Sequence, residues 1–134
     1  MTVLNDLYRC DICGNIVEIV QKGADALVCC GEEMKKIEVE TQEPVKGEKH
    51  TPVLVNGEDG EFYIKVGETE HPMTDEHFIA FIEAISTDGK YLTRKFLKEG
   101  EKPELKLECK CSNMVARALC NIHGLWQSIL SKNN

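Results

Sequence analysis

Four cysteines crowd into the first 30 residues of the chain, and they constrain its fold more than any other feature. Cys10 and Cys13 form a CxxC pair. After fifteen further residues, Cys29 and Cys30 form an adjacent pair. The segment that holds them is too short to fold on an apolar core alone, because chains below about 40 residues usually need a metal or disulfides. Four converging thiolates favour tetrahedral zinc or iron, and the spacing leaves the choice of metal open.

Two disulfides, or a redox CxxC of the thioredoxin kind, are the alternatives for these cysteines. Disulfides are rare in the cytosol, and an odd total of seven cysteines fits metal chemistry better than a disulfide framework. The N-terminus lacks the basic and then apolar pattern of a signal peptide. No apolar run approaches the ~18 residues that span a membrane. We therefore expect a cytoplasmic protein with no membrane partner.

The chain is acidic, with a formal net charge of -7. It has no basic stripe with interleaved aromatic residues, so nucleic acid is not expected as a partner. An acidic surface repels small anions at long range. An anionic substrate would therefore need local positive charge at its site.

The pattern of turns and apolar residues predicts a mainly β protein with two domains. Residues 1–37 form the small metal domain, with strands expected over 7–9, 16–20 and 26–28. Residues 38–47 are charged, contain Pro44 and Gly47, and are expected to be a linker. Residues 48–134 are expected to form an immunoglobulin-like β-sandwich, because short strands follow one another at regular spacing. The expected strands are 53–55, 61–66, 77–86, 91–97, 104–111 and 114–120. A helix over 76–84 is the alternative for one of them.

The chain has four histidines, and each lies beside a turn or at the end of an expected strand. They are His50, His71, His77 and His123. Cys120 precedes the last of them by three residues. Any one histidine taken alone is more simply a surface or core residue, but together the five side chains make a nitrogen-rich donor set with one sulfur, which suits iron. Five protein ligands would leave one octahedral position open, as in a catalytic site.

Cys109 and Cys111 fit a different interpretation. They share the apolar face of an alternating strand with Leu105 and Leu107. Buried free cysteines commonly behave as small apolar residues. We therefore expect this pair in the core.

These motifs, in this order, resemble the desulfoferrodoxin family of two-iron superoxide reductases. The resemblance is carried by the CxxC and the adjacent cysteine pair, by Glu48-Lys49-His50 before a proline, by His71-Pro-Met with His77, and by Cys120-Asn-x-His123-Gly. It spans nearly the whole chain. Because all four N-terminal cysteines are present, the chain resembles the two-centre class and not the neelaredoxin type, which lacks that centre.

The resemblance implies two iron ions per chain. One is a rubredoxin-like tetrathiolate iron bound by Cys10, Cys13, Cys29 and Cys30. The other is a square-pyramidal iron with four equatorial histidines, His50, His71, His77 and His123, and Cys120 as the axial ligand. It also implies a desulforedoxin-like domain before the sandwich, a homodimer, and the one-electron reduction of superoxide to hydrogen peroxide with a rubredoxin-like electron donor.

Two catalytic residues are implied beside the iron ligands. Glu48 matches the family's glutamate that ligates the oxidised iron, and a carboxylate is a hard ligand suited to ferric iron. Lys49 matches the lysine near the open face, where it would supply the positive charge that an anionic substrate needs. Two other functions stay open: a non-enzymatic iron electron-transfer protein, and a zinc-ribbon module that binds a protein partner.

Overall fold

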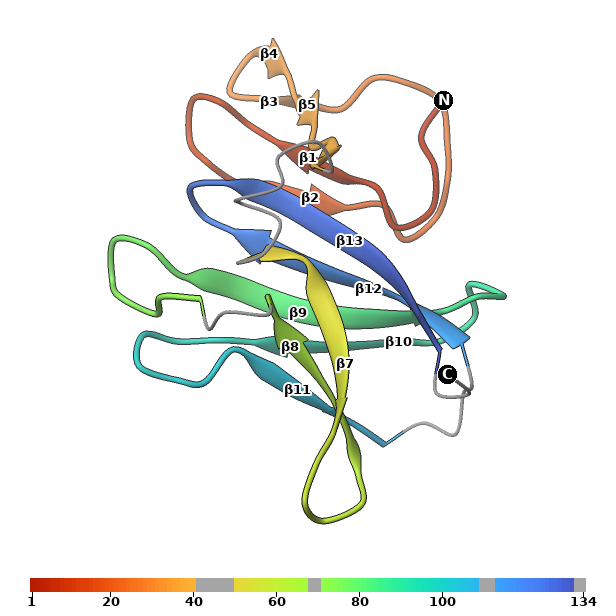
Figure 1. The fold of residues 1–134 in the computed structure, drawn as a ribbon. Coiled ribbons are helices and arrows are strands. Elements are labelled where there is room, and N and C mark those ends of the chain that lie inside the picture. The colour runs from red at the N-terminus through yellow and green to blue at the C-terminus, as the bar shows by residue number, and fades with distance from the viewer. Residues whose placement is uncertain (41–49, 68–70, 109–112, 132–134) are drawn as a thin grey trace. The chain divides into compact units, whose positions relative to one another are not determined.

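The structure is a computed structural model that describes residues 1–40, 50–67, 71–108 and 113–131. The chain divides into two compact units, Met1–Glu38 and Val39–Asn134, each with its own sheets (Figure 1). Four residues singled out in the sequence lie outside the described ranges: Glu48, Lys49, Cys109 and Cys111. Within those ranges we find no helix with the length and apolar character needed to cross a bilayer.

The first unit contains five short strands. A three-stranded antiparallel sheet has the order β2-β1-β5, and a two-stranded hairpin pairs β3 with β4. Their bounds are β1 Leu7–Arg9, β2 Ile16–Glu18, β3 Val28–Cys29, β4 Glu32–Glu33 and β5 Lys35–Lys36. The buried apolar side chains of this unit are Leu7, Cys10 and Ile19. So small a core cannot hold the unit together without further bonds.

The second unit is a β-sandwich, which confirms the fold class predicted from the sequence. One sheet has five strands in the order β10-β9-β12-β13-β6, and the other has three in the order β11-β8-β7. Strand β6 runs parallel to its neighbour, β13. The bounds are β6 Val39–Glu40, β7 Pro52–Asn56, β8 Phe62–Val66, β9 Ile79–Ser86, β10 Leu92–Phe96, β11 Glu104–Leu107, β12 Asn113–Cys120 and β13 Gly124–Ser131.

The strand expected over 77–86 is present as β9, whereas the alternative of a helix was wrong and one strand was not expected at all. The segment 76–84 offers no helix, because residues from Ile79 onward form strand β9 between β10 and β12. Strand β13 was missed altogether, although it pairs along its whole length with β12. Its sequence, GLWQSILS, breaks the alternation of polar and apolar residues that marks a half-buried strand. The predicted linker, 38–47, contains β6 at residues 39–40, and its residues from 41 onward lie outside the described part of the chain.

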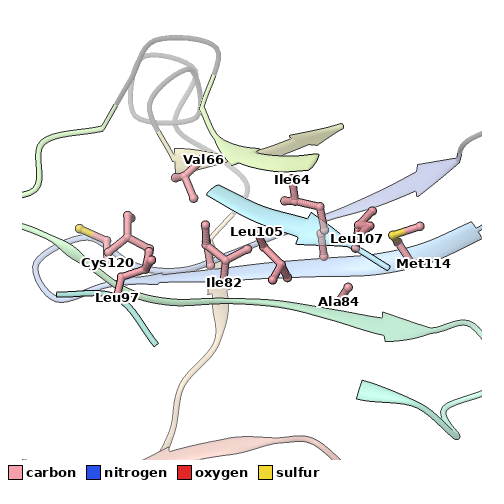
Figure 2. Packing of buried hydrophobic residues seen from close by; sticks show 12 residues of the cluster. Ile64, Val66, Ile82, Ala84, Leu97, Leu105, Leu107, Met114 and Cys120 are labelled. Atoms are coloured by element: carbon pink, nitrogen blue, oxygen red, sulfur yellow. The ribbon is translucent and has the colours of Figure 1, made fainter. Parts of the chain in front are cut away.

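The core lies between the two sheets of the sandwich (Figure 2). Along β12, Met114, Ala116, Ala118 and Cys120 alternate toward it, as the period of two in a strand requires. The core also holds Ile64, Val66, Ile82, Ala84, Leu97, Leu105 and Leu107. Cys120 is thus the last core-facing residue of its strand, at the end where the histidines lie.

A buried carboxylate lies in the middle of the five-stranded sheet. Glu83 on β9 is directly opposite Arg94 on β10 and Arg117 on β12. Its side chain is fully buried; one oxygen bonds Arg117, and the other accepts from Arg94 Nη2 at 2.6 Å and Nε at 2.8 Å. The guanidinium of Arg94 also lies 5.0 Å from the ring centre of Phe81. Both charged bonds join neighbouring strands across the sheet.

We expect Glu83→Gln to destabilise the sandwich by about 3–5 kcal/mol, because it leaves buried arginine charge without its counter-charge. Urea unfolding followed by the fluorescence of Trp126, which lies in the same unit, measures this loss. Glu99→Gln makes the same chemical change at an exposed position and is the matched control. Equal stability of the two variants would contradict the expectation.

Candidate metal centres

Five side chains far apart in the sequence converge at one end of the sandwich. The ligand atoms of His50, His71, His77, Cys120 and His123 all lie within 4.8 Å of one another. We call them the five-donor cluster. His50 comes shortly before β7, and His71 and His77 lie between β8 and β9. Cys120 ends β12, and His123 lies in the turn that leads into β13.

The four imidazole rings form a square. Neighbouring ring centres, taken in the order His50, His71, His77, His123 and back, are 4.6, 4.6, 4.9 and 4.8 Å apart, with planes inclined by 70° to 79°. The opposite pair, His50 and His77, is 6.3 Å apart. The Nε2 atom of His50 lies 3.0 Å from Nε2 of His71 and 3.1 Å from Nδ1 of His123. A square of nitrogen atoms with edges of 3.0 to 3.1 Å has its centre about 2.1–2.2 Å from each corner, close to the usual length of a metal–imidazole bond.

The sulfur of Cys120 completes the cluster from within the sandwich. It lies 3.4 Å from Nε2 of His71 and 3.8 Å from Nδ1 of His123, and it accepts the backbone N–H of His123 at 3.4 Å. The ladder between β12 and β9 shifts register between Leu119 and Cys120. Such irregularities re-aim a side chain at the end of a strand. Among the described residues, no sixth His, Cys, Asp or Glu joins the cluster.

A three-residue hairpin turn presents Cys120 and His123 together. Cys120 pairs with Gly124 across the turn, and Gly124 has a φ of +88°, which a residue with a Cβ rarely adopts. The glycine that closes the motif in the sequence is therefore required by the backbone.

The protonation state of His71 suits a metal. Burial lowers the pKa of His71 to about 4, so its imidazole is neutral at pH 7. Its Nδ1 lies 2.7 Å from the carbonyl oxygen of Pro72 and donates to it, which leaves the Nε2 lone pair facing the cluster. The Nε2 atom of His77 is buried and has no hydrogen-bond partner among the described residues. A buried nitrogen without a partner is costly, and a bound cation would satisfy it.

Trp126 supports two of the histidines, and sequence reasoning missed it. Its ring stacks on His50 with centres 5.1 Å apart and planes inclined by 21°. Its Nε1–H donates to the carbonyl oxygen of His123 at 3.1 Å. Its position in the sequence could have indicated this role, since it is the chain's single tryptophan and follows His123 by three residues.

The four N-terminal cysteines form a second cluster, which we call the four-thiol cluster. The sulfur of Cys29 lies 3.6 Å from that of Cys13 and 3.9 Å from that of Cys30. A tetrahedron with edges of about 3.7 Å has its centre about 2.3 Å from each corner, the usual metal–thiolate distance. The cluster therefore fits a zinc or iron ion.

The adjacent cysteine pair lies at the tip of the β3–β4 hairpin. Cys29 pairs with Glu32, so Cys30 and Gly31 are the two turn residues, and their φ values are 55° and 77°. Two successive left-handed residues make a type I′ turn, the common tight turn of hairpins. This backbone explains how neighbouring residues in the chain can both face one ion.

The pKa values of the free thiols show why the four-thiol cluster needs a cation. The backbone N–H of Cys13 lowers the pKa of Cys10 to about 7. In contrast, the hydrogen bond with the Cys13 thiol raises the pKa of Cys29 to about 12. Four thiolates would repel one another at this distance, so all four ionise together only around a positive ion.

Comparison with known proteins agrees with this arrangement. The sequence pattern of the family described as desulfoferrodoxin matches residues 42–129, and that of the desulfoferrodoxin N-terminal domain matches residues 2–37. A desulfoferrodoxin homolog of Archaeoglobus fulgidus is 47% identical over 96% of this chain and 99% of its own. The chain belongs to the desulfoferrodoxin family. This confirms the resemblance drawn from the motifs.

Solved structures similar to this desulfoferrodoxin family member include two superoxide reductases. The superoxide reductase of Treponema pallidum has a TM-score of 0.68 and 25% identity, over 92% of this chain and 95% of its own. A variant of the superoxide reductase (neelaredoxin) of Ignicoccus hospitalis has a TM-score of 0.53 and 26% identity, over 69% of this chain and 86% of its own. The two clusters of the present chain agree with the two iron sites that the family implies.

Proposed function

We propose that this chain is a superoxide reductase that removes reactive oxygen species in the cytoplasm. It would reduce superoxide by one electron, with two protons taken up, to hydrogen peroxide. The observation that carries the proposal is the square of four imidazoles with the sulfur of Cys120 beside it. Relatives named superoxide reductase support it.

Iron bound in the five-donor cluster would supply the electron and an open coordination position for superoxide. The chain's own residues prepare that position. The neutral imidazole of His71 offers its lone pair, and Cys120 offers a sulfur that accepts the backbone N–H of His123. A thiolate ligand raises the electron density at a metal, so Cys120 would make a bound iron a better electron donor.

We assign catalytic roles to Glu48 and Lys49 on the strength of the family motif. Glu48 would ligate the iron after oxidation and protect it between turnovers. Lys49 would attract superoxide against the net charge of -7, since a local cation acts within a Debye length of about 8 Å.

Lys49→Ala should slow the association of superoxide about 10-fold at low ionic strength and flatten its salt dependence, because it removes the attracting charge. Pulse radiolysis across a salt series measures both quantities. Lys46→Ala removes the same charge three residues earlier and is the matched control. A rate constant equal to that of the control would remove Lys49 from the mechanism.

The four-thiol cluster is proposed to hold the second iron and to pass electrons from a rubredoxin-like donor, in a homodimer. Cys13 and Cys30 are exposed, which suits exchange of electrons with a partner. The same exposure favours a second candidate function, a non-enzymatic iron electron-transfer protein. A carrier of that kind would not need a metal that takes external ligands.

One experiment separates these functions. The metal content and optical spectrum of the purified chain are measured first, and the reduced protein is then mixed with azide or with pulse-generated superoxide. A superoxide reductase binds two irons, takes azide and consumes superoxide. Two irons without azide binding would indicate the electron carrier. Two zinc ions and no colour would indicate a zinc-ribbon module.

A further inference from the structure

The side chain of Asn121 joins two segments that supply donors to the five-donor cluster. Asn121 follows Cys120 directly, in the turn that also carries His123. Its Oδ1 accepts the backbone N–H of Phe78 at 2.8 Å, and its Nδ2 donates to the backbone carbonyl of Glu76 at 2.9 Å. These two residues flank His77.

The carboxamide of Asn121 thus pairs with the backbone on both sides of His77, as a neighbouring peptide group would. The backbone N–H of Asn121 adds a third bond, to the carbonyl oxygen of Phe78 at 3.1 Å. Three hydrogen bonds therefore tie the segment 76–78 to the segment 120–123. Between them, the two segments supply three of the five donors of the cluster.

Two of the other histidines are held through their rings. The ring of His71 is held by the carbonyl of Pro72, and that of His50 stacks on Trp126. His77 is held instead through its backbone and its two neighbours in the chain. The backbone of His77 is held from the other side by Thr74, whose hydroxyl accepts its N–H at 3.0 Å.

We propose that Asn121 is a positioning residue that sets His77 in place relative to Cys120 and His123. Without the carboxamide, the segment 76–78 would keep the bond from the backbone N–H of Asn121 and the bonds to Thr74, but it would lose two of its three bonds to the turn. His77 would then spend less time at bonding distance from the metal. The inference rests on the proposed iron site, but not on its reaction with superoxide.

The test is the affinity of the full chain for ferrous iron, measured by competition with a chelator of known affinity. Asn121→Ala should lower the affinity of the five-donor cluster about 10- to 100-fold, as loss of a group that orients a ligand does. The optical spectrum of the ferric cluster should change as well. Asn113→Ala removes the same side chain at the far end of β12 and should leave affinity and spectrum unchanged.

A double-mutant comparison shows whether Asn121 acts through His77. In a chain that already carries His77→Ala, the further change Asn121→Ala should lower the affinity by less than about 2-fold, because the ligand it positions is gone. If the two substitutions lowered the iron affinity independently, so that their effects multiplied, the proposal would be overturned. It would also be overturned if the Asn121→Ala chain bound iron as tightly as the Asn113→Ala control. If the unaltered chain held no iron in the five-donor cluster, the proposed function would fail with it. If the unaltered chain bound iron and Asn121→Ala left its affinity unchanged, this inference alone would be overturned.

Discussion

Replacing Cys120 with serine is expected to abolish superoxide reduction while leaving the sandwich folded. The side chain is fully buried and is the one sulfur among the five donors. A serine hydroxyl has nearly the same size, but it stays protonated at neutral pH and is a poor donor to iron. Loss of a group that merely orients a ligand costs about 10- to 100-fold, so loss of the ligand itself should cost at least about 100-fold in activity.

The activity of the Cys120→Ser chain is measured with pulse-generated superoxide, and its iron content by elemental analysis. Its thermal unfolding should stay close to that of the unaltered chain when both are stripped of metal. Cys13→Ser makes the same chemical change in the four-thiol cluster and should spare the reaction site. A Cys120→Ser chain that retained most of its activity would show that the thiolate is not required.

Replacing Cys10 with serine should unfold the first unit while sparing the second. The unit Met1–Glu38 buries few apolar side chains, and Cys10 is one of them at 2% exposed. Structural zinc in peptides of this size contributes about 10–16 kcal/mol of apparent folding free energy. Because so little apolar burial remains without the metal, we expect residues 1–38 to lose their fixed structure.

Backbone NMR spectra of the full chain test this expectation. Signals from the first unit should collapse into the narrow range of unfolded peptides in the Cys10→Ser chain, while those of β7 to β13 keep their dispersion. The Cys120→Ser chain should show an intact first unit and is the reciprocal control. Well-dispersed signals from residues 1–38 in a metal-free Cys10→Ser chain would contradict the expectation.

The sequence predicted the nitrogen donors because histidines are few in this chain. With four histidines in total, and a cysteine three residues before the last, little choice remained for a nitrogen-rich site. The structure brings all of these side chains together, and likewise the four N-terminal cysteines. Their assignment as iron ligands stays a prediction until a metal is measured. Glu48 and Lys49 lie outside the described residues, so their roles stay predictions too.

What the sequence did not predict depends on contacts between distant residues. Trp126 stacks on His50, far from it along the chain, and no local pattern marks such a pair. No local pattern pairs Glu83 with Arg94 and Arg117, which lie directly opposite it on the two neighbouring strands. Strand β13 was missed because its polar and apolar residues do not alternate one by one, which is the pattern that identifies a half-buried strand.

The five-donor cluster draws its side chains from both layers of the sandwich. His50 and His71 flank β7 and β8 of the three-stranded sheet, whereas Cys120 and His123 belong to the hairpin of the five-stranded sheet. An ion bound by all of these side chains would cross-link one sheet to the other. Binding of the metal and packing of the two sheets at that end of the sandwich are therefore thermodynamically coupled. A change that separates the two sheets there would also release the ion.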